Sequence, residues 1–507
     1  MNRGMSIGAD KETSNGTNNG ANDKASNRQS VLNVELYGTH LGTLTQSGKG
    51  LEFSTNSDVF DKYSVSSTIM SLAVPLLLRY TSIQKKRAEN FFSELLPEGR
   101  NYDWLIQTLP FSEQNTFGIL RKYGKDIAGA LLIYDPKDPV SHRKAEAEPV
   151  DAKEIRYLLE HMPQAALANA PESGKTSLGG VQGKILLAKK SDVWYRVHYG
   201  YPSTHILKPV VHDYPTMIYD EAFCMQMDFA SGLTKYPVHI ESFDNTDALV
   251  IERYDRRDNV AGHRIHQEDF NQVLGAKGSE KYQEYGGKVS AKRVAQILER
   301  FGRDSDVERF ASQLIFAIAI GNLDMHAKNI SILHLPDESL ELAPTYDQVP
   351  LRHHNTDGKM ALAVNGEYYH ANITLRSIVS EILSWRCRKF SEETVVINFI
   401  KNCLEAYSNA LECAILNEKA YPLLKSYNPL QSKNNNTWIA RFCFHPINSS
   451  YSQLPLMPYC SALLLAFSTN FLSKPILLRS FIAFRVVVAP SLICKTLNIL
   501  NNTGDIF

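Results

Sequence analysis

The hydrophobic and polar positions first predict a small α+β unit over residues 31–135. Residues 31–37 partly alternate between apolar and polar side chains before two glycines, a pattern that predicts a strand and a hairpin. A third strand is expected at residues 51–53. Residues 91–100 predict a helix that ends at a Pro/Gly turn, and residues 117–132 predict a helix, a turn and a strand. No residue type or spacing in this unit indicates chemistry.

Prolines and charges then fill residues 136–150, which predicts a linker. Helical periodicity follows, with Ile155, Leu158 and Leu159 on one face. Beyond it we expect two lobes. Residues 151–260 form the first, and residues 261–424 form a second, mostly helical one.

A glycine-rich segment, SGKTSLGGVQGKILL, occupies residues 173–187. Glycines let backbone N–H groups approach phosphate oxygens because no Cβ stands in the way. A Walker A loop is excluded, since the glycine it requires is replaced by Asn169 in one alignment and by Leu178 in the other. A cover over a nucleotide and an ordinary glycine hairpin both remain open.

Two strands follow with polar residues at their ends. Residues 204–209 (THILKP) carry Lys208, which resembles a phosphate-binding lysine, although a strand-end lysine is more often a solvated edge residue. Glu221 opens a helix-like stretch and could pair with Lys208, or simply favour a helix N-terminus. Near Glu252 and Tyr254, a buried strand runs into polar residues, where a hinge facing an adenine ring or a strand end with a surface charge cluster would fit.

The segment GNLDMHAKNIS at residues 321–331 follows an apolar run that predicts the end of a buried helix. It places Asp324 five residues ahead of Asn329. Phosphoryl transfer needs such a pair, because the acid accepts the proton of an attacking hydroxyl and the amide oxygen helps hold Mg²⁺. An ordinary aspartate turn after a helix fits this stretch equally well when it is considered alone. A predicted hairpin over residues 331–344 then leads to Asp347, a second candidate metal ligand.

The composition of the chain argues against several classes of protein. The 507 residues carry no net formal charge and are 43% apolar, so nothing in the global balance calls for nucleic acid or an anionic membrane. Seven scattered cysteines without a C-x-x-C pair disfavour a disulfide framework and a zinc site, and suit a reducing cytosol. No secretory signal or transmembrane span is predicted, so we expect a cytoplasmic protein.

Both ends differ from the rest of the chain. Residues 1–30 are rich in Asn, Ser, Gly and Lys, which predicts a disordered tail. Between Glu418 and Asp505 there is no acidic residue, and apolar runs lie among Ser, Asn and Pro. We expect residues 425–507 to be an atypical tail, and one hypothesis is translation in an altered reading frame.

Taken in order, these segments resemble the HipA family of serine/threonine-protein kinase toxins over about residues 31–424. The resemblance is carried by SLGGVQGK at 177–184, THILKP at 204–209, ERYDR at 252–256, QED at 267–269, GNLDMHAKN at 321–329 and PTYD at 344–347. It implies an α+β, bilobal protein-kinase-like fold with an N-terminal HipA-type subdomain. Gly183 departs from relatives that carry an acidic residue there, and the C-terminal tail has no counterpart.

The resemblance also implies roles for individual residues. Asp324 would be the catalytic base, and Mg²⁺ would be bound by Asn329 and Asp347. Ser177 would be the site of autophosphorylation, and Glu221 would hold Lys208 by an ion pair. The residues that would contact ATP are Lys208, His326, Glu252, Tyr254, Tyr346, Gly179, Gly180, Val181 and Gln182.

Two functions remain open from the sequence. The first is an ATP- and Mg²⁺-dependent serine/threonine kinase that inhibits growth as a toxin. Its expected partners are a HipB-like helix-turn-helix antitoxin, through which it would reach DNA, and a protein substrate such as an aminoacyl-tRNA synthetase. The second is a catalytically silent nucleotide-binding module of a toxin–antitoxin repressor complex.

Overall fold

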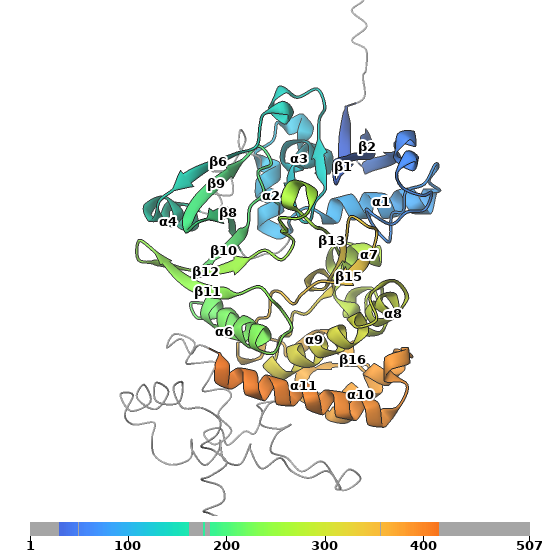
Figure 1. The fold of residues 1–507 in the computed structure, drawn as a ribbon, viewed down its shortest axis with the longest axis vertical. Coiled ribbons are helices and arrows are strands. Elements are labelled where there is room, and N and C mark those ends of the chain that lie inside the picture. The colour runs from blue at the N-terminus through green and yellow to red at the C-terminus, as the bar shows by residue number, and fades with distance from the viewer. Residues whose placement is uncertain (1–29, 49, 162–175, 178–182, 355, 415–507) are drawn as a thin grey trace, which may run out of the picture.

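A computed structural model describes residues 30–48, 50–161, 176–177, 183–354 and 356–414 of the chain. The predicted N-terminal tail, the C-terminal tail and the glycines at 179–180 therefore lie outside the described residues. In Figure 1 the N-terminal unit (blue) lies at the upper right, a sheet (teal to green) lies at the upper left, and the C-terminal helices (yellow to orange) lie below both.

The N-terminal unit is the α+β subdomain that the sequence predicts. Its four-stranded sheet has the order β3-β2-β1-β5, and the alternating pattern of β1 places every second residue in the core. The strands are β1 (Val31–Leu36), β2 (Thr39–Ser47), β3 (Gly50–Thr55) and β5 (Leu132–Tyr134), and the helices are α1 (Ser82–Glu94), α2 (Gly99–Gln107) and α3 (Thr116–Tyr123). A two-residue strand, β4 (Asp126–Ile127), pairs in parallel with β7 (Thr176–Ser177).

A six-stranded antiparallel sheet forms the next layer, in the order β11-β12-β10-β8-β9-β6. Its strands are β6 (Glu146–Val150), β8 (Ile185–Lys190), β9 (Val193–His198), β10 (His205–Pro209), β11 (Val238–Phe243) and β12 (Thr246–Glu252), and the helices beside it are α4 (Ala152–Glu160) and α6 (Met217–Ala230). The predicted apolar face of α4 packs in one cluster with Trp194 and Leu207, which attaches this helix to the sheet.

One boundary prediction is wrong. Residues 136–150 are not simply a linker, because β6 lies within them and pairs with β9 along its whole length. The charges and Pro149 in β6 suggest a loop from sequence, yet they also suit an edge strand. Such a strand needs few ladder hydrogen bonds, and its exposed polar side chains discourage further pairing.

The C-terminal lobe is mostly helical, as expected. Its helices are α7 (Phe270–Val273), α8 (Ala291–Phe301), α9 (Asp306–Ile320), α10 (Leu375–Ser384) and α11 (Glu393–Cys413), and its strands are β13 (His266–Asp269), β14 (Ser331–His334), β15 (Leu340–Leu342), β16 (Lys359–Val364) and β17 (Glu367–Tyr369). The largest hydrophobic core surrounds α9, whose residues from Leu314 to Ile320 are all buried. None of the described helices is both long enough and apolar enough to cross a membrane.

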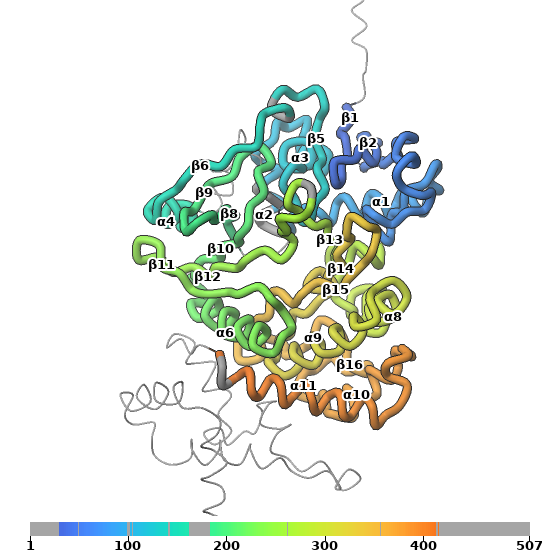
Figure 2. The backbone as a smooth tube through the Cα atoms, viewed as in Figure 1, coloured from blue at the N-terminus to red at the C-terminus, as the bar shows by residue number. Residues whose placement is uncertain are grey.

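The three-stranded sheet β13-β14-β15 connects the N-terminal subdomain to this lobe, as the chain path in Figure 2 shows. Glu268 of β13 is fully buried and accepts hydrogen bonds from the backbone of Leu72 (2.9 Å) and from His334 Nε2 (3.1 Å). Tyr37 of the subdomain donates to the carbonyl of His334 at 2.5 Å. Buried polar groups that take hydrogen-bond partners from across the interface fix how the two units pack.

Candidate active site

The loop between α9 and β14 is the centre of the candidate site. Gly321 ends α9 in the left-handed region (φ 72°), where a Cβ would lie 2.6 Å from the Cβ of Arg352. Glycine therefore allows both the turn and the close approach of the residue 352 backbone. The chain then turns back through residues 322–329 and enters β14.

Hydrogen bonds inside this loop fix Asp324 and Asn329 relative to each other. Asn322 Oδ1 accepts from the Asp324 backbone N–H at 3.0 Å, and Asn329 Nδ2 donates to the Asp324 carbonyl at 2.9 Å. Because the amide nitrogen of Asn329 is committed to that carbonyl, its oxygen is the atom left to act as a ligand. Asn322 also donates to the Asp347 carbonyl at 3.4 Å, which ties the two segments together.

Asp347 approaches the loop from the segment after β15. It has a positive φ of 57°, a conformation that is rare for residues other than glycine and that is found at functional sites. Its carboxylate accepts a hydrogen bond from Lys208 Nζ at 2.5 Å. Burial alone would raise the pKa of Asp347, but the charges of Lys208 and Lys184 outweigh it and lower the pKa. This carboxylate is therefore ionised at neutral pH.

Lys208 on β10 joins both lobes of the site. Its Nζ donates to Glu221 of α6 at 2.7 Å as well as to Asp347, so the ion pair expected between Lys208 and Glu221 is present. Burial alone would lower the pKa of Lys208, but Asp347 and Glu221 raise it. Glu221 is fully buried, and its pKa is raised by that burial despite the opposing charge of Lys208. The lysine is held as a cation in the cleft.

The Asp324 carboxylate has a pKa raised to about 6, chiefly by burial and then by the negative charge of Asp347. The phenol of Tyr282 donates to Asp324 Oδ1 at 3.0 Å, and His326 Nε2 lies 3.8 Å from Asp324 Oδ2. Burial and the charge of Lys281 lower the pKa of His326 to about 3, so this imidazole is neutral. A carboxylate with a pKa near 6 suits a general base at neutral pH.

Glu252 and Tyr254, expected around an adenine ring, and Tyr346, expected to contact ATP, differ in their exposure and in their contacts. Glu252 is exposed at the end of β12. The ring of Tyr254 lies 5.6 Å from that of Tyr346, and its hydroxyl donates to Gln267 at 2.6 Å. Tyr346 donates to the carbonyl of Lys328 at 2.8 Å. Tyr346 therefore supports the loop that carries Asp324, Tyr254 packs against Tyr346, and a contact of either tyrosine with a nucleotide stays a prediction.

Residues 178–182 and the side chain of Ser177 lie outside the described residues, so the expected roles of Gly179, Gly180, Val181, Gln182 and Ser177 stay predictions. Lys184, just beyond the glycine-rich segment, is a residue that sequence reasoning considered only as a Walker lysine and rejected. Its pKa is lowered to about 8 by burial and by the charge of Lys208, so its ammonium group lies within electrostatic reach of that lysine.

Sequence reasoning also missed what the N-terminal subdomain contributes, because it expected no chemistry there. Glu94, at the end of α1, accepts from Lys328 Nζ at 2.9 Å, and Glu98 lies 3.3 Å from the same atom. Glu98 also accepts from Lys281 Nζ at 2.6 Å. Two acids of the subdomain therefore hold one cation inside the loop that carries Asp324, Lys328, and one outside it, Lys281.

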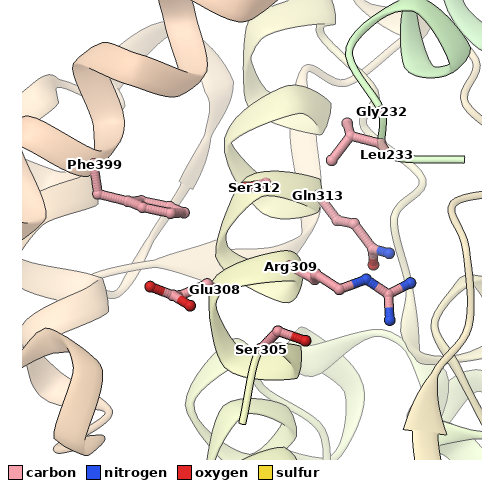
Figure 3. Close-up of a pocket in the computed structure, with 8 residues that line it drawn as sticks. All are labelled: Gly232, Leu233, Ser305, Glu308, Arg309, Ser312, Gln313 and Phe399. Atoms are coloured by element: carbon pink, nitrogen blue, oxygen red, sulfur yellow. The ribbon is translucent and has the colours of Figure 1, made fainter. Parts of the chain in front are cut away.

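Two pockets lie away from the residues of the candidate site. One, of 320 Å³, is lined by α9, α11 and the loop after α6, and Figure 3 shows Arg309 and Gln313 extending from α9 on the side of Leu233. The other, of 540 Å³, adjoins it near Arg257 and Glu341. Neither contains a residue predicted for the site. The candidate site is therefore assigned from the convergence of charged side chains.

Comparisons with known proteins agree with this geometry. A family model described as the HipA-like C-terminal domain matches residues 176–410, and one described as the HipA N-terminal domain matches residues 32–134. A putative kinase, Y4mE, of Sinorhizobium fredii is 33% identical over 326 residues, which cover 62% of this chain and 76% of that protein.

The serine/threonine-protein kinase toxin HipA of Shewanella oneidensis is 28% identical over 350 residues, which cover 65% of this chain and 78% of the toxin. A solved complex of Shewanella oneidensis HipA with HipB and operator DNA superimposes with a TM-score of 0.64 at 22% identity, over 81% of this chain and 96% of the matched chain. The α+β, bilobal protein-kinase-like fold expected from sequence is confirmed by this likeness.

Proposed function

The chain belongs to the HipA family of serine/threonine-protein kinase toxins, and from that premise we propose that it transfers the γ-phosphoryl group of ATP to a protein hydroxyl with Mg²⁺. The observation that carries this proposal is the ion pair between Lys208 and Asp347, which are 139 positions apart in sequence, with Asp324 close enough for the charge of Asp347 to raise its pKa. Chance placement of a strand-end lysine or a turn aspartate would not produce that arrangement.

The side chains present fit both expected cofactors. Asp347 and Asn329 offer a carboxylate and an amide oxygen, and such hard oxygen ligands are those that Mg²⁺ prefers. Lys208 and Lys184 offer positive charge beside them for phosphate oxygens. Bound ATP would supply the phosphoryl group, and bound Mg²⁺ would offset the charge that develops on it.

The remaining chemistry belongs to the chain itself. Asp324 accepts the proton of the attacking hydroxyl through its carboxylate, which is ionised above about pH 6. Tyr282 holds that carboxylate in orientation through the hydrogen bond to Oδ1. Lys208 is kept in position by Glu221, so its cation stays directed at the cleft while the reacting groups approach.

Growth inhibition, regulation by a HipB-like antitoxin and autophosphorylation of Ser177 belong to the same proposal. The antitoxin is supported by the solved relative, whose complex contains HipB and operator DNA. A phosphate on Ser177 would add up to about two negative charges to a loop suited to bind phosphate, so repulsion would oppose ATP binding. Co-expression with a HipB-like protein is expected to relieve growth arrest caused by the kinase.

Labelled ATP and Mg²⁺ test the activity directly. We expect the wild type to incorporate label, Asp324→Ala to incorporate none, and Asp258→Ala, at a fully exposed aspartate, to match the wild type. Equal labelling of wild type and Asp324→Ala would exclude the proposal. Thermal stabilisation by ATP and Mg²⁺ without any turnover would favour a silent nucleotide-binding module instead. Phosphoproteomes after expression of wild type and Asp324→Ala would then identify the target.

A further inference from the structure

A second cluster of chemically competent side chains lies beside the active site but outside the residues used above. Asp220 of α6 and the adjacent residues His353 and His354 each offer one ligand atom, and these three atoms all lie within 4.8 Å of one another. Asp220 is fully buried, and the two histidine side chains are 13% and 14% exposed. The three residues come from segments 133 positions apart, so the fold brings them together.

The spacing of the ligand atoms matches a metal-binding geometry. Asp220 Oδ2 lies 3.2 Å from His353 Nε2 and 3.7 Å from His354 Nε2. A tetrahedral ion with bonds of about 2.0–2.1 Å places its ligand atoms about 3.4 Å apart, between the two observed values. The two imidazole rings lie side by side, with centroids 4.0 Å apart, so both nitrogens face the same carboxylate.

The hydrogen bonding of the cluster is incomplete among the described residues. Asp220 Oδ2 accepts from Thr216 at 2.9 Å and is hydrogen-bonded to His353 Nε2 at 3.2 Å, but Asp220 Oδ1 has no partner within the part of the chain that the structure describes. His354 Nε2 is likewise buried there without a hydrogen bond. Buried polar atoms are rarely left unsatisfied, and such an exception calls for an explanation such as an ion.

The protonation state also suits a ligand role. Burial, and then the neighbouring charge of His353, lowers the pKa of His354, which favours the neutral imidazole that binds metals. Two imidazoles and one carboxylate form a borderline donor set, suited to Zn²⁺ and related transition-metal ions rather than to Mg²⁺. This set differs from the oxygen ligands Asp347 and Asn329.

We propose that Asp220, His353 and His354 form a binding site for one zinc-class divalent cation, with a fourth position open to water. The ion would join the first turn of α6, where Glu221 pairs with Lys208, to the segment that follows Asp347. It would therefore hold together the two elements that position the cleft lysine. Its effect would be structural, and it does not depend on the chemistry proposed for Asp324.

Titration of metal-free protein with Co²⁺ tests this site. We expect one equivalent to bind with the strong visible absorption of a tetrahedral nitrogen/oxygen site, Zn²⁺ to displace it, and a large excess of Mg²⁺ to leave it in place. The same ions should raise the melting temperature of the apo protein. If the wild type binds no Co²⁺ or Zn²⁺, or Mg²⁺ displaces them, the cluster is only a hydrogen-bonded ion pair and the proposal falls.

Variants separate this site from the nucleotide site. Asp220→Asn and His353→Gln should each lose the absorption, and His354→Gln provides a third variant if either of them fails to melt cooperatively. His212→Gln is the matched control, because that histidine is fully exposed in the loop before α6. Asp347→Asn should keep Co²⁺ binding even though it removes an oxygen ligand proposed for Mg²⁺. Retained absorption in Asp220→Asn and His353→Gln would overturn the assignment.

Discussion

Two buried lysines of this protein are each held between two carboxylates, yet their surroundings differ. Lys208 bonds to Glu221, which is fully buried, and to Asp347, whose side chain is 38% exposed at the cleft. One side of this lysine therefore faces the place where a ligand would enter. Its partner Asp347 is itself a candidate ligand of Mg²⁺, so the ion pair between Lys208 and Asp347 can be replaced by contacts with the metal and the phosphates.

Lys328 belongs to the same loop as Asp324, but it points the other way. It bonds to Glu94 and Glu98 of the N-terminal subdomain, and its side chain is only 6% exposed. Burial alone would lower the pKa of Lys328, but Asp269 and Glu94 raise it. The comparison teaches that similar ion pairs can serve different purposes. The Lys208 pair includes a partly exposed carboxylate, and the Lys328 pair fastens the loop that carries Asp324 to the N-terminal subdomain.

Lys328→Met should have the largest effect on stability. The substitution leaves the Glu94 carboxylate buried without its cation, and breaking a buried pair from one side costs about 3–5 kcal/mol. Urea denaturation monitored by circular dichroism would measure the loss. Lys86→Met is the matched control, since that exposed lysine pairs with Glu89 on the surface of α1 and should change stability by less than about 0.5 kcal/mol.

A second variant shows whether the cost comes from the stranded charge. Glu94→Gln in the Lys328→Met background removes that charge, while its single side-chain oxygen can still accept from one of the two donors, Asn271 Nδ2 or the Gly278 N–H. The double variant should recover part of the lost stability. No recovery would mean that packing of the lysine stem, and not its charge, fastens the loop.

Lys208→Met should instead act on activity. Removing one preorganised cation from a phosphoryl-transfer site typically lowers kcat by about 10²–10³-fold. Stability should fall by only about 1–2 kcal/mol, because Asp347 keeps solvent access and the raised pKa of Glu221 lets it take up a proton. Labelled-phosphate transfer and urea denaturation measure the two effects. A stability loss as large as that of Lys328→Met, with activity retained, would remove the distinction between the two lysines.

The two carboxylates that pair with Lys328, Glu94 and Glu98, can each be neutralised by substitution. Burial alone would raise the pKa of Glu98, but the charges of Lys328 and Lys281 outweigh it and lower the pKa. A lowered carboxylate pKa adds stability that is present at neutral pH and is lost as the carboxylate becomes protonated. Glu98→Gln should therefore cost about 1 kcal/mol at pH 7, and less as the pH falls below 4.5. A cost that does not change with pH in urea denaturation would contradict this account.

The same contrast shows what the sequence can predict. Asp324, Asn329 and Asp347 follow a spacing set by chemistry, and the apolar runs around them predict the helix and hairpin that present them. Glu94 carries no such signal, because it meets Lys328 across 234 positions and neither neighbourhood has a distinctive pattern. Strand β6 was missed for a related reason, since an edge strand is defined by its partner β9 more than by its own residues.

The smallest expected effect concerns Tyr282, which links the two regions. Its neighbour Lys281 pairs with Glu98 of the subdomain, and its own hydroxyl donates to Asp324 Oδ1. That hydrogen bond favours the ionised carboxylate and lowers a pKa that burial and Asp347 have raised to about 6. Since the base must be unprotonated, kcat/KM of the wild type should fall as the pH drops through about 6.

Tyr282→Phe removes the donor, so the pKa of Asp324 should rise further and the acid limb of the pH profile should move up by about half a unit to one unit. Activity on the alkaline plateau should fall less than about tenfold, because Phe keeps the edge-to-face packing against His326. A profile of kcat/KM between pH 5 and 8 measures both quantities, with Tyr285→Phe as the control at a largely exposed neighbouring phenol. If the acid limb stays where it is and only the plateau falls, Tyr282 supports the loop without changing the pKa of Asp324. The subdomain would then influence Asp324 through packing alone.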